Sequence, residues 1–210
     1  MMKPYDVFLV IVLLVLSSFS PVSAQTHPDY YPLPQGAEWT LKGQGTSPDI
    51  TWKVVGTESI SGRDYVKIED IYDEGENDRQ PVIKYARCDG GRIYWLVPPG
   101  EEVLMFDLDA VINEWWTETV THPDGSKGIR TGGIIDWNMT VNTPAGSFDN
   151  CIVCNLIETR ETDHGITTTP YTFWLAPGVG IVKMTLTINS GLFSIDSWVN
   201  DLSEYTLPRE

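Results

Sequence analysis

The chain has few histidines and few positive charges, and these two shortages exclude several classes of function. Only three histidines occur in 210 residues, His27, His122 and His164. Each falls in the leader or in a predicted turn, so no spacing typical of a zinc site or of a histidine-activated nucleophile is present. Lys and Arg total 14 against 29 Asp and Glu, a formal net charge of -15. That charge repels phosphate groups and anionic lipids, so we expect no nucleic acid among the partners.

The chain also lacks long apolar runs after its N-terminus. Residues 1–24 combine Lys3, an apolar core over 7–16 and the small residues Val22-Ser23-Ala24, which is the pattern of a cleavable secretory signal. The apolar core is shorter than the roughly 20 residues that span a bilayer. No cysteine adjoins the cleavage site, so a lipid anchor is not predicted. We therefore predict cleavage after Ala24 and a secreted or periplasmic product without stable membrane insertion.

Cysteine is scarce, with three residues: Cys88, Cys151 and Cys154. On one strand Cys151 and Cys154 would have Cα atoms about 10 Å apart, which is too far for a disulfide. A bridge from Cys88 to either of the other two stays open. We favour Cys88 with Cys151, because each lies at the end of a predicted strand beside a turn, in a chain predicted to reach an oxidising compartment.

Short runs of β-branched and aromatic residues, separated by turn residues, make up most of the mature chain. Asp89-Gly90-Gly91 between two such runs is typical of a tight hairpin. From Ile134 to Val141 two sets of residues alternate with the period of a half-buried strand, so we expect one set to face inward. Val182, Met184, Leu186 and Ile188 are predicted to face inward in the same way.

About ten to twelve short strands follow from this pattern. The predicted strands are 37–42, 51–58, 63–72, 82–88, 92–97, 102–108, 116–121, 134–141, 151–159, 167–175, 182–188 and a last one through Phe193, Ile195 and Val199. Residues 109–117 fit either a short helix capped by Asp109 or a β-arc. We predict an all-β, mainly antiparallel fold with at most one short helix, in one domain over 37–205 after a signal at 1–24 and a lead at 25–36. A barrel or strongly curved meander is favoured, with a β-sandwich as the alternative.

Acidic residues provide the only candidates for chemistry. The acidic cluster over 69–78 lacks the alternating oxygen ligands and closing Glu of a calcium loop, so we expect a solvated hairpin tip and no metal site. No cofactor motif is present either. Glu114 and Glu118 flank Trp115 and Trp116, and two carboxylates in an aromatic cleft can hydrolyse glycans. This pair is the weak catalytic alternative, against the interpretation that the tryptophans are core and the glutamates solvated.

Aromatic residues are abundant, with eight Trp and nine Tyr. A curved sheet with inward-facing aromatic side chains can enclose an apolar ligand. Trp39, Trp137, Trp174 and Trp198 lie on predicted strands and are the candidates for lining such a site. Aromatic residues on strands are more often plain core, and this interpretation competes with the ligand site.

Three stretches together resemble a known group of proteins. They are Tyr30-Tyr-Pro-Leu-Pro-Gln-Gly-Ala-Glu-Trp39, Thr143-Pro-Ala-Gly-Ser-Phe-Asp-Asn-Cys151 and Trp174-Leu-Ala-Pro-Gly-Val-Gly-Ile-Val-Lys183. In this order they resemble landmarks of a broad group of uncharacterised secreted or lipid-anchored prokaryotic β-domain proteins. The resemblance implies one extracytoplasmic β-domain, akin to the open barrels of lipoprotein carriers, with no assigned chemistry. We expect a non-catalytic domain that binds an apolar ligand or a protein partner, the alternative being a glycan-acting hydrolase.

Overall fold

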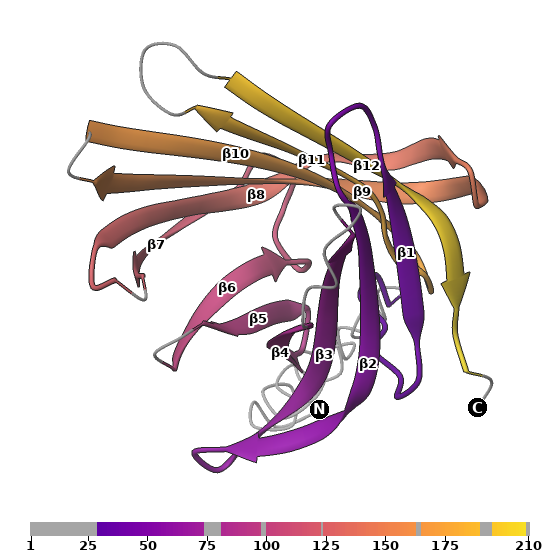
Figure 1. Cartoon of the computed structure of the whole chain (residues 1–210), viewed down its shortest axis with the longest axis horizontal. Helices are drawn as coiled ribbons and strands as arrows, with labels where there is room; N and C mark the ends of the chain where they lie inside the picture. Colours follow the sequence, from indigo (N-terminus) through magenta and orange to yellow (C-terminus); the bar gives the residue numbers. More distant parts are fainter. Residues whose placement is uncertain are drawn as a thin grey trace, which may run out of the picture.

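Figure 1 shows the computed structural model of the chain, which describes residues 29–73, 81–97, 100–122, 124–162, 165–189 and 195–208. Every regular element in these ranges is a strand. The strands are β1 (Glu38–Gly43), β2 (Asp49–Ile60), β3 (Arg63–Asp73), β4 (Val82–Asp89), β5 (Arg92–Val97), β6 (Glu101–Asp107), β7 (Trp115–Thr121), β8 (Lys127–Thr143), β9 (Gly146–Thr162), β10 (Gly165–Ala176), β11 (Gly180–Asn189) and β12 (Ile195–Thr206). The predicted all-β class is therefore confirmed. The predicted signal at 1–24 lies outside the described residues.

All twelve strands belong to one antiparallel sheet in the order β6-β5-β4-β3-β2-β1-β12-β11-β10-β9-β8-β7. Neighbours in the sheet are consecutive in the chain except β1 and β12, which pair with each other. The sheet curls until its two edge strands, β6 and β7, face each other, so it forms a nearly closed barrel rather than a sandwich (Figure 1). Where the structure describes the predicted hairpin turns, they lie as expected: Gly90, for example, takes the positive φ of 61° that the turn between β4 and β5 needs. The predicted turns around 163–164 and 190–191 lie outside the described residues.

The segment between β6 and β7 forms turns, so of the two alternatives for residues 109–117 the β-arc is correct and the helix is wrong. Asn113 adopts a φ of 63° and donates its backbone N–H to the carbonyl of Ile134 on β8 at 2.8 Å. The amide of Glu114 bonds to the carbonyl of Val111. The backbone groups that a helix would use are thus engaged in a turn and in a contact with the sheet.

The long strand β8 departs from the simple alternation predicted for residues 134–141. Ile134 is 1% exposed and Val141 is 7% exposed, although they belong to opposite sets of the predicted pattern, while Met139 is 39% exposed. The register with β9 shifts three times between Ile134 and Val141, and Asn138 has a φ of 59°. Each added residue reverses which face the next side chain takes, and this is why one clean face was the wrong prediction.

The neighbouring strands follow the predicted pattern more closely. Val182, Met184 and Leu186 on β11 are all buried, as expected. On β9 the consecutive residues from Cys151 to Cys154 are buried on both faces of the sheet. This continuous burial is what a central strand requires.

One end of the barrel is closed by the N-terminal lead. Tyr30 and Tyr31 are only 5% and 6% exposed, so this part of the lead belongs to the core. The carbonyl of Asp29 accepts the N–H of Gly178 at 2.7 Å, and the hydroxyl of Tyr30 donates to the carbonyl of Asn150 at 3.0 Å. The three landmark stretches of the sequence therefore meet at this closed end.

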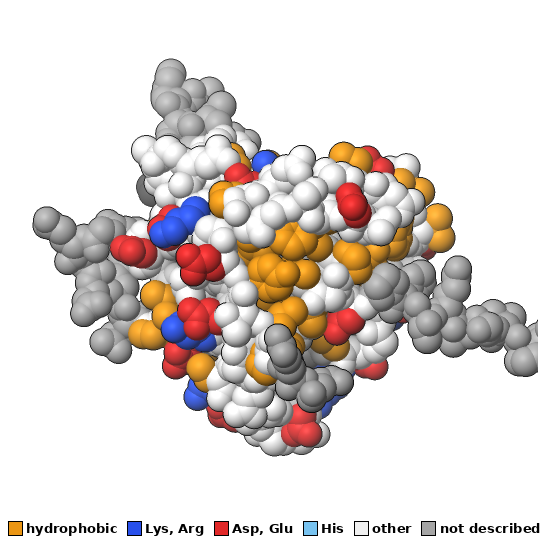
Figure 2. Space-filling model, turned by 90° about the vertical axis from the view of Figure 1, so that its right-hand side faces the viewer, with side chains coloured by type: hydrophobic (Ala, Val, Ile, Leu, Met, Phe, Trp, Pro, Cys, Tyr) orange, Lys and Arg blue, Asp and Glu red, His pale blue; other side chains and the backbone are white. Residues whose placement is uncertain are grey.

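The outer surface is mixed in character. On the face shown in Figure 2, hydrophobic side chains gather near the middle and acidic side chains are distributed around them. The rings of Phe148 on β9 and Tyr205 on β12 pack together at 6.1 Å, with Tyr205 41% exposed.

Trp39 offers a test of how much the closed end contributes to stability. Its indole N–H donates to the carbonyl of Val179 at 2.7 Å from a ring that is 4% exposed. We expect Trp39→Phe to lower the free energy of unfolding by about 1–3 kcal/mol, because the partner carbonyl loses its donor in a buried setting. Urea unfolding measures this change. Trp174→Phe, at a ring that lies 5.6 Å from the Nζ of Lys183, is the control and should cost less; equal losses would contradict the prediction.

Candidate functional site

The barrel holds a partly open cavity of about 350 Å³ toward the end opposite the lead. Its lining residues come from β2 to β6 and from β8 to β12, near the points where β3 runs into β4, β5 into β6 and β11 into β12. Apolar and aromatic groups dominate the wall. They are Ile50, Trp52, Trp95, Val97, Val103, Met105, Leu156, Phe173, Met184, Leu186 and Trp198. The polar members are Tyr72, Lys84, Arg130, Glu158 and Tyr171.

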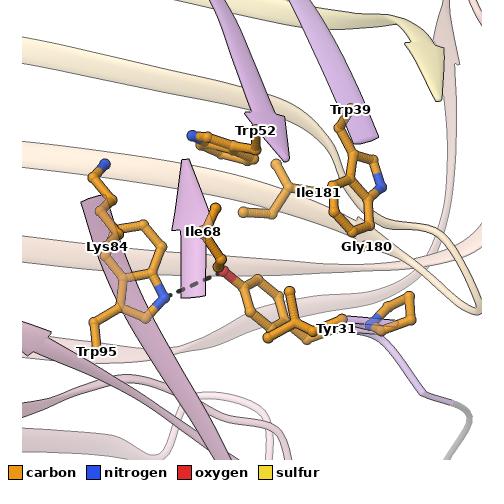
Figure 3. Close-up of a pocket in the computed structure, with 10 residues that line it drawn as sticks. Tyr31, Trp39, Trp52, Ile68, Lys84, Trp95, Gly180 and Ile181 are labelled. Atoms are coloured by element: carbon orange, nitrogen blue, oxygen red, sulfur yellow. Dashed lines mark hydrogen bonds between the residues drawn. The ribbon is translucent and has the colours of Figure 1, made fainter. Parts of the chain in front are cut away.

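Three lining residues, Trp52, Lys84 and Trp95, form the floor of this cavity, on the side toward the lead. Figure 3 shows Tyr31 between the strands, its hydroxyl accepting the indole N–H of Trp95 at 3.2 Å. Trp52, Lys84 and Trp95 line the cavity above and also a small hollow of about 20 Å³ around Tyr31 and Trp39. Tyr31 lines the small hollow but not the cavity, and Trp52, Lys84 and Trp95 lie between the two. Burial raises the pKa of Tyr31 above its ordinary value, so its hydroxyl stays neutral.

One ion pair lies at this floor. Asp70 is fully buried, accepts the indole N–H of Trp52 at 2.9 Å and pairs with the ammonium of Lys84. The Lys84 ammonium also lies 4.8 Å from the ring centroid of Trp95, a cation–π distance. A charge pair inside an apolar barrel does not add much stability compared with apolar packing. Its position against the cavity makes it a candidate for contacting a ligand.

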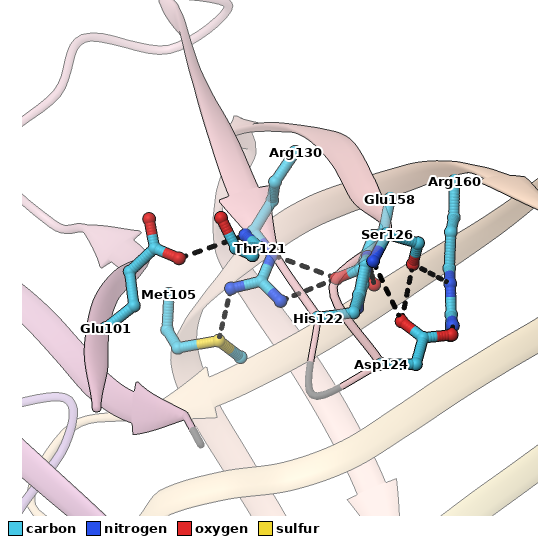
Figure 4. Close-up of polar contacts among 9 residues, drawn as sticks. All are labelled: Glu101, Met105, Thr121, His122, Asp124, Ser126, Arg130, Glu158 and Arg160. Carbon is cyan, nitrogen blue, oxygen red and sulfur yellow. Dashed lines mark hydrogen bonds and ion pairs between the residues drawn. The ribbon is translucent and has the colours of Figure 1, made fainter. Parts of the chain in front are cut away.

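A second ion pair lies on the other side of the cavity. Arg130 is 8% exposed and donates to Glu158 from Nη2 at 2.5 Å and from Nε at 3.1 Å. Nε2 of His122 lies 3.6 Å from the other carboxylate oxygen of Glu158 (Figure 4). The guanidinium reaches β6 as well, with Nη1 3.8 Å from the sulfur of Met105. The cavity is therefore amphipathic, with two neutralised charge pairs in an aromatic wall.

The four tryptophans predicted to line a site lie in different places. Trp198 borders the cavity, whereas Trp39 lines the small hollow at the closed end. Trp137 packs edge-on against the Tyr30 ring at 6.3 Å, and Trp174 stacks with Lys183. None of these last three is among the residues that line the cavity.

Trp52 and Trp95 are the lining tryptophans that the sequence did not single out, together with the charged residues Lys84 and Arg130. Both tryptophans lay on predicted strands. Their inward orientation depends on the register and on the bulge between β5 and β6 at Ile93/Tyr94, which no sequence pattern revealed. A cation next to apolar residues in a predicted strand was the only available indication.

Glu114 and Glu118, the weak catalytic alternative, serve separate backbone partners. Glu114 accepts the N–H of Val111 at 3.2 Å and borders a shallow surface hollow with Trp115 and Trp116. Glu118 accepts the N–H of Leu104 at 2.9 Å and does not line that hollow. A glycosidase needs its two carboxylates in one cleft, whereas here only Glu114 of the pair lines the hollow. The geometry therefore does not favour glycan hydrolysis.

The three cysteines are free thiols in the structure: Cys88 is exposed, and Cys151 and Cys154 are buried. The thiol of Cys151 lies 3.3 Å from the carbonyl oxygen of Phe148. The Cys88–Cys151 bridge predicted from the sequence is therefore not formed here.

Among the described residues, no group of three or more His, Cys, Asp or Glu side chains is arranged to hold a metal ion. Residues 74–78 of the acidic cluster lie outside the described ranges. In the same part of the chain no helix is long and apolar enough to cross a membrane.

Comparison with known proteins identifies proteins of similar fold but indicates no activity. No model of a known protein family matches the chain, and no curated protein matches it. A solved structure of a "putative lipoprotein" from Parabacteroides distasonis has a TM-score of 0.56 at 17% identity, over 87% of this chain and all of that one. A "putative exported protein with YmcC-like fold" from Bacteroides fragilis has a TM-score of 0.53 at 14% identity, over 86% of this chain and all of that one. At these identities the likeness shows a shared fold alone.

Two glutamates on the edge strands give a pH test with opposite signs. Burial raises the pKa of Glu118 above 4.5, so its ionised form is disfavoured in the folded state. Burial also acts on Glu102, but hydrogen bonds from Arg87 and Tyr65 outweigh it and lower the pKa of this carboxyl.

A raised pKa in the folded state means that stability is lost as the pH rises through that pKa, and a lowered pKa means the reverse. Relative to the unmodified chain, Glu118→Gln should therefore gain stability between acidic and neutral pH. Glu102→Gln should lose stability over the same range. Urea unfolding at a series of pH values measures both differences, and a parallel response of the two variants would contradict the assignment.

Proposed function

We propose that this protein is an exported, non-catalytic binding protein that holds an amphipathic small molecule inside its barrel. The observation that carries the proposal is the cavity of about 350 Å³ inside the barrel, with an aromatic wall and two ion pairs beside it. This volume is within the usual range of ligand pockets, roughly 300–1,000 Å³. A sheet whose only purpose was stability would fill this space with side chains.

The wall chemistry indicates the kind of ligand. Phe173, Leu186 and Trp198 provide apolar surface for a hydrocarbon portion. Lys84 and Arg130 provide hydrogen-bond donors for a polar portion. Because each of them already pairs with a carboxylate, these two ion pairs carry no net charge that would favour an anionic ligand over a neutral one. An amphiphile with an apolar body and a polar group that accepts hydrogen bonds fits both features.

Export supports the same proposal. The N-terminal sequence pattern predicts a cleaved signal, and the two solved structures with this fold are described as a lipoprotein and an exported protein, each qualified as putative. We propose a secreted or periplasmic location. Intact-mass measurement of protein from the extracytoplasmic fraction of the natural host should show a chain that begins at Gln25, and a cytosolic product that retains residues 1–24 would contradict it.

Filling the cavity tests the binding function. Leu186 lines the cavity, and the larger ring of Leu186→Trp would occupy part of its volume. We expect the fluorescence of phenylnaphthylamine, an uncharged apolar probe, to rise on binding to the unmodified protein and to show at least tenfold weaker binding to this variant. Ile129→Trp makes a comparable change at a side chain that is 53% exposed, and should bind as the unmodified protein does.

Both variants should melt within a few degrees of the unmodified protein, which a thermal scan checks. Undiminished binding by Leu186→Trp would place the probe outside the cavity and contradict the proposal. Native mass spectrometry of protein purified from its own host extends the test, because a retained small molecule would identify the ligand.

A further inference from the structure

The edge strands β6 and β7 meet along a line that we call the seam. Among the described residues no backbone ladder joins these two strands, whereas every other neighbouring pair in the barrel is joined by one. Side chains bridge the seam instead. Oε1 of Glu118 on β7 accepts the N–H of Leu104 on β6 at 2.9 Å, and Oε2 of Glu101 on β6 accepts the N–H of Thr121 on β7 at 3.0 Å.

These two bonds are reciprocal, each strand supplying one carboxylate and one backbone donor. Figure 4 shows the bond from Glu101 to Thr121 beside the contact between Arg130 and Met105. Opening a paired strand would break a run of backbone bonds together, but in the described ranges the hydrogen bonds across these edges are two carboxylate bonds and one weak sulfur contact. Separating β6 from β7 therefore breaks fewer of these hydrogen bonds than separating two paired strands does.

The cavity lies directly behind the seam. Val103 and Met105 line it from β6, and Arg130 and Glu158 line it from β8 and β9, the two strands that follow β7 in the sheet. Glu101 and Leu104 are three residues apart, so the two bonds are spaced by about 10 Å along the strand. An opening between them would be long and narrow. It would admit an extended chain lengthwise more readily than a compact molecule.

We propose that the seam is a side entrance to the cavity for an amphiphile with an unbranched alkyl chain, and that Glu101 and Glu118 hold this entrance closed. The proposal rests on the binding function above and specifies its ligand class and route. The alkyl chain of the ligand moves sideways between β6 and β7, while the polar group of the ligand remains near Arg130 and Glu158. The ligand therefore need not pass through the end of the barrel.

Removing the two carboxylates tests the route. In Glu101→Ala/Glu118→Ala the edges lose both bonds, each of which involves a charged acceptor and is worth about tenfold or more in an equilibrium. Stopped-flow fluorescence with dansyl-undecanoic acid, a straight-chain probe, should show association and dissociation that are both at least fivefold faster. The dissociation constant should change less than threefold, because a gate alters rates without altering the bound state. Glu101→Gln/Glu118→Gln keeps an acceptor oxygen at both positions and should behave as the unmodified protein does.

Rates that are unchanged in the double alanine variant would overturn the side entrance while leaving the binding function intact. An unmodified protein that binds neither dansyl-undecanoic acid nor phenylnaphthylamine would instead overturn the binding function itself. Hydrogen exchange on the unmodified protein provides a measurement that needs no variant to fold. The amides of Leu104 and Thr121 should exchange at least a hundredfold faster than that of Val153 on β9. Equal protection at these three positions would also overturn the entrance.

Discussion

The hydrogen bond from the indole of Trp39 to the carbonyl of Val179 ties an early part of the chain to a late one. Trp39 lies on the first strand, and Val179 lies in the turn between the tenth and eleventh strands. The lead lies against the same turn through the bond between Asp29 and Gly178. The contacts of Trp39 and of the lead hold one end of the barrel together. The cavity lies toward the other end, where the strands remain paired, as in Gly165 with Thr162 and Asn189 with Ile195, so its space comes from the curl of the sheet.

Charge inside the barrel is distributed unlike charge on its surface. The chain carries -15 overall, yet the cavity contains two cations, each matched by one carboxylate. Asp70 and Arg130 are buried, and Lys84 and Glu158 are half-buried. Placing charged groups in such positions costs more than placing apolar ones of similar size, even when the groups are paired. The proposed binding of an amphiphile would use these pairs to recognise its polar group.

The sequence predicted the strands and turns well because these depend on local chemistry. The Asp-Gly turn at 89–91 and the alternation from Val182 to Leu186 needed only neighbouring residues. The face of β8 was mispredicted because three register shifts depend on how β9 lies beside it. The cavity could not be located for the same reason: the inward position of Trp52 and Trp95 follows from the pairing of distant strands, and Tyr31 bonds to Trp95 at the floor from a lead that looks like loose chain. Glu118 could be noticed as a carboxylate beside aromatic residues, but only the closure of the sheet shows that it faces β6.

The pairing of β1 with β12 has a consequence for how the protein reaches its native state. These strands are the first and the last along the chain, so the pairing spans more than 150 residues of sequence, as in Glu38 with Thr206. Until β12 has been synthesised, β1 and β11 both present unpaired edges that invite aggregation. Contacts of such long range also make folding slow. The barrel therefore cannot close before β12 has been synthesised, whereas hairpins of consecutive strands such as β2 and β3 need only neighbouring parts of the chain.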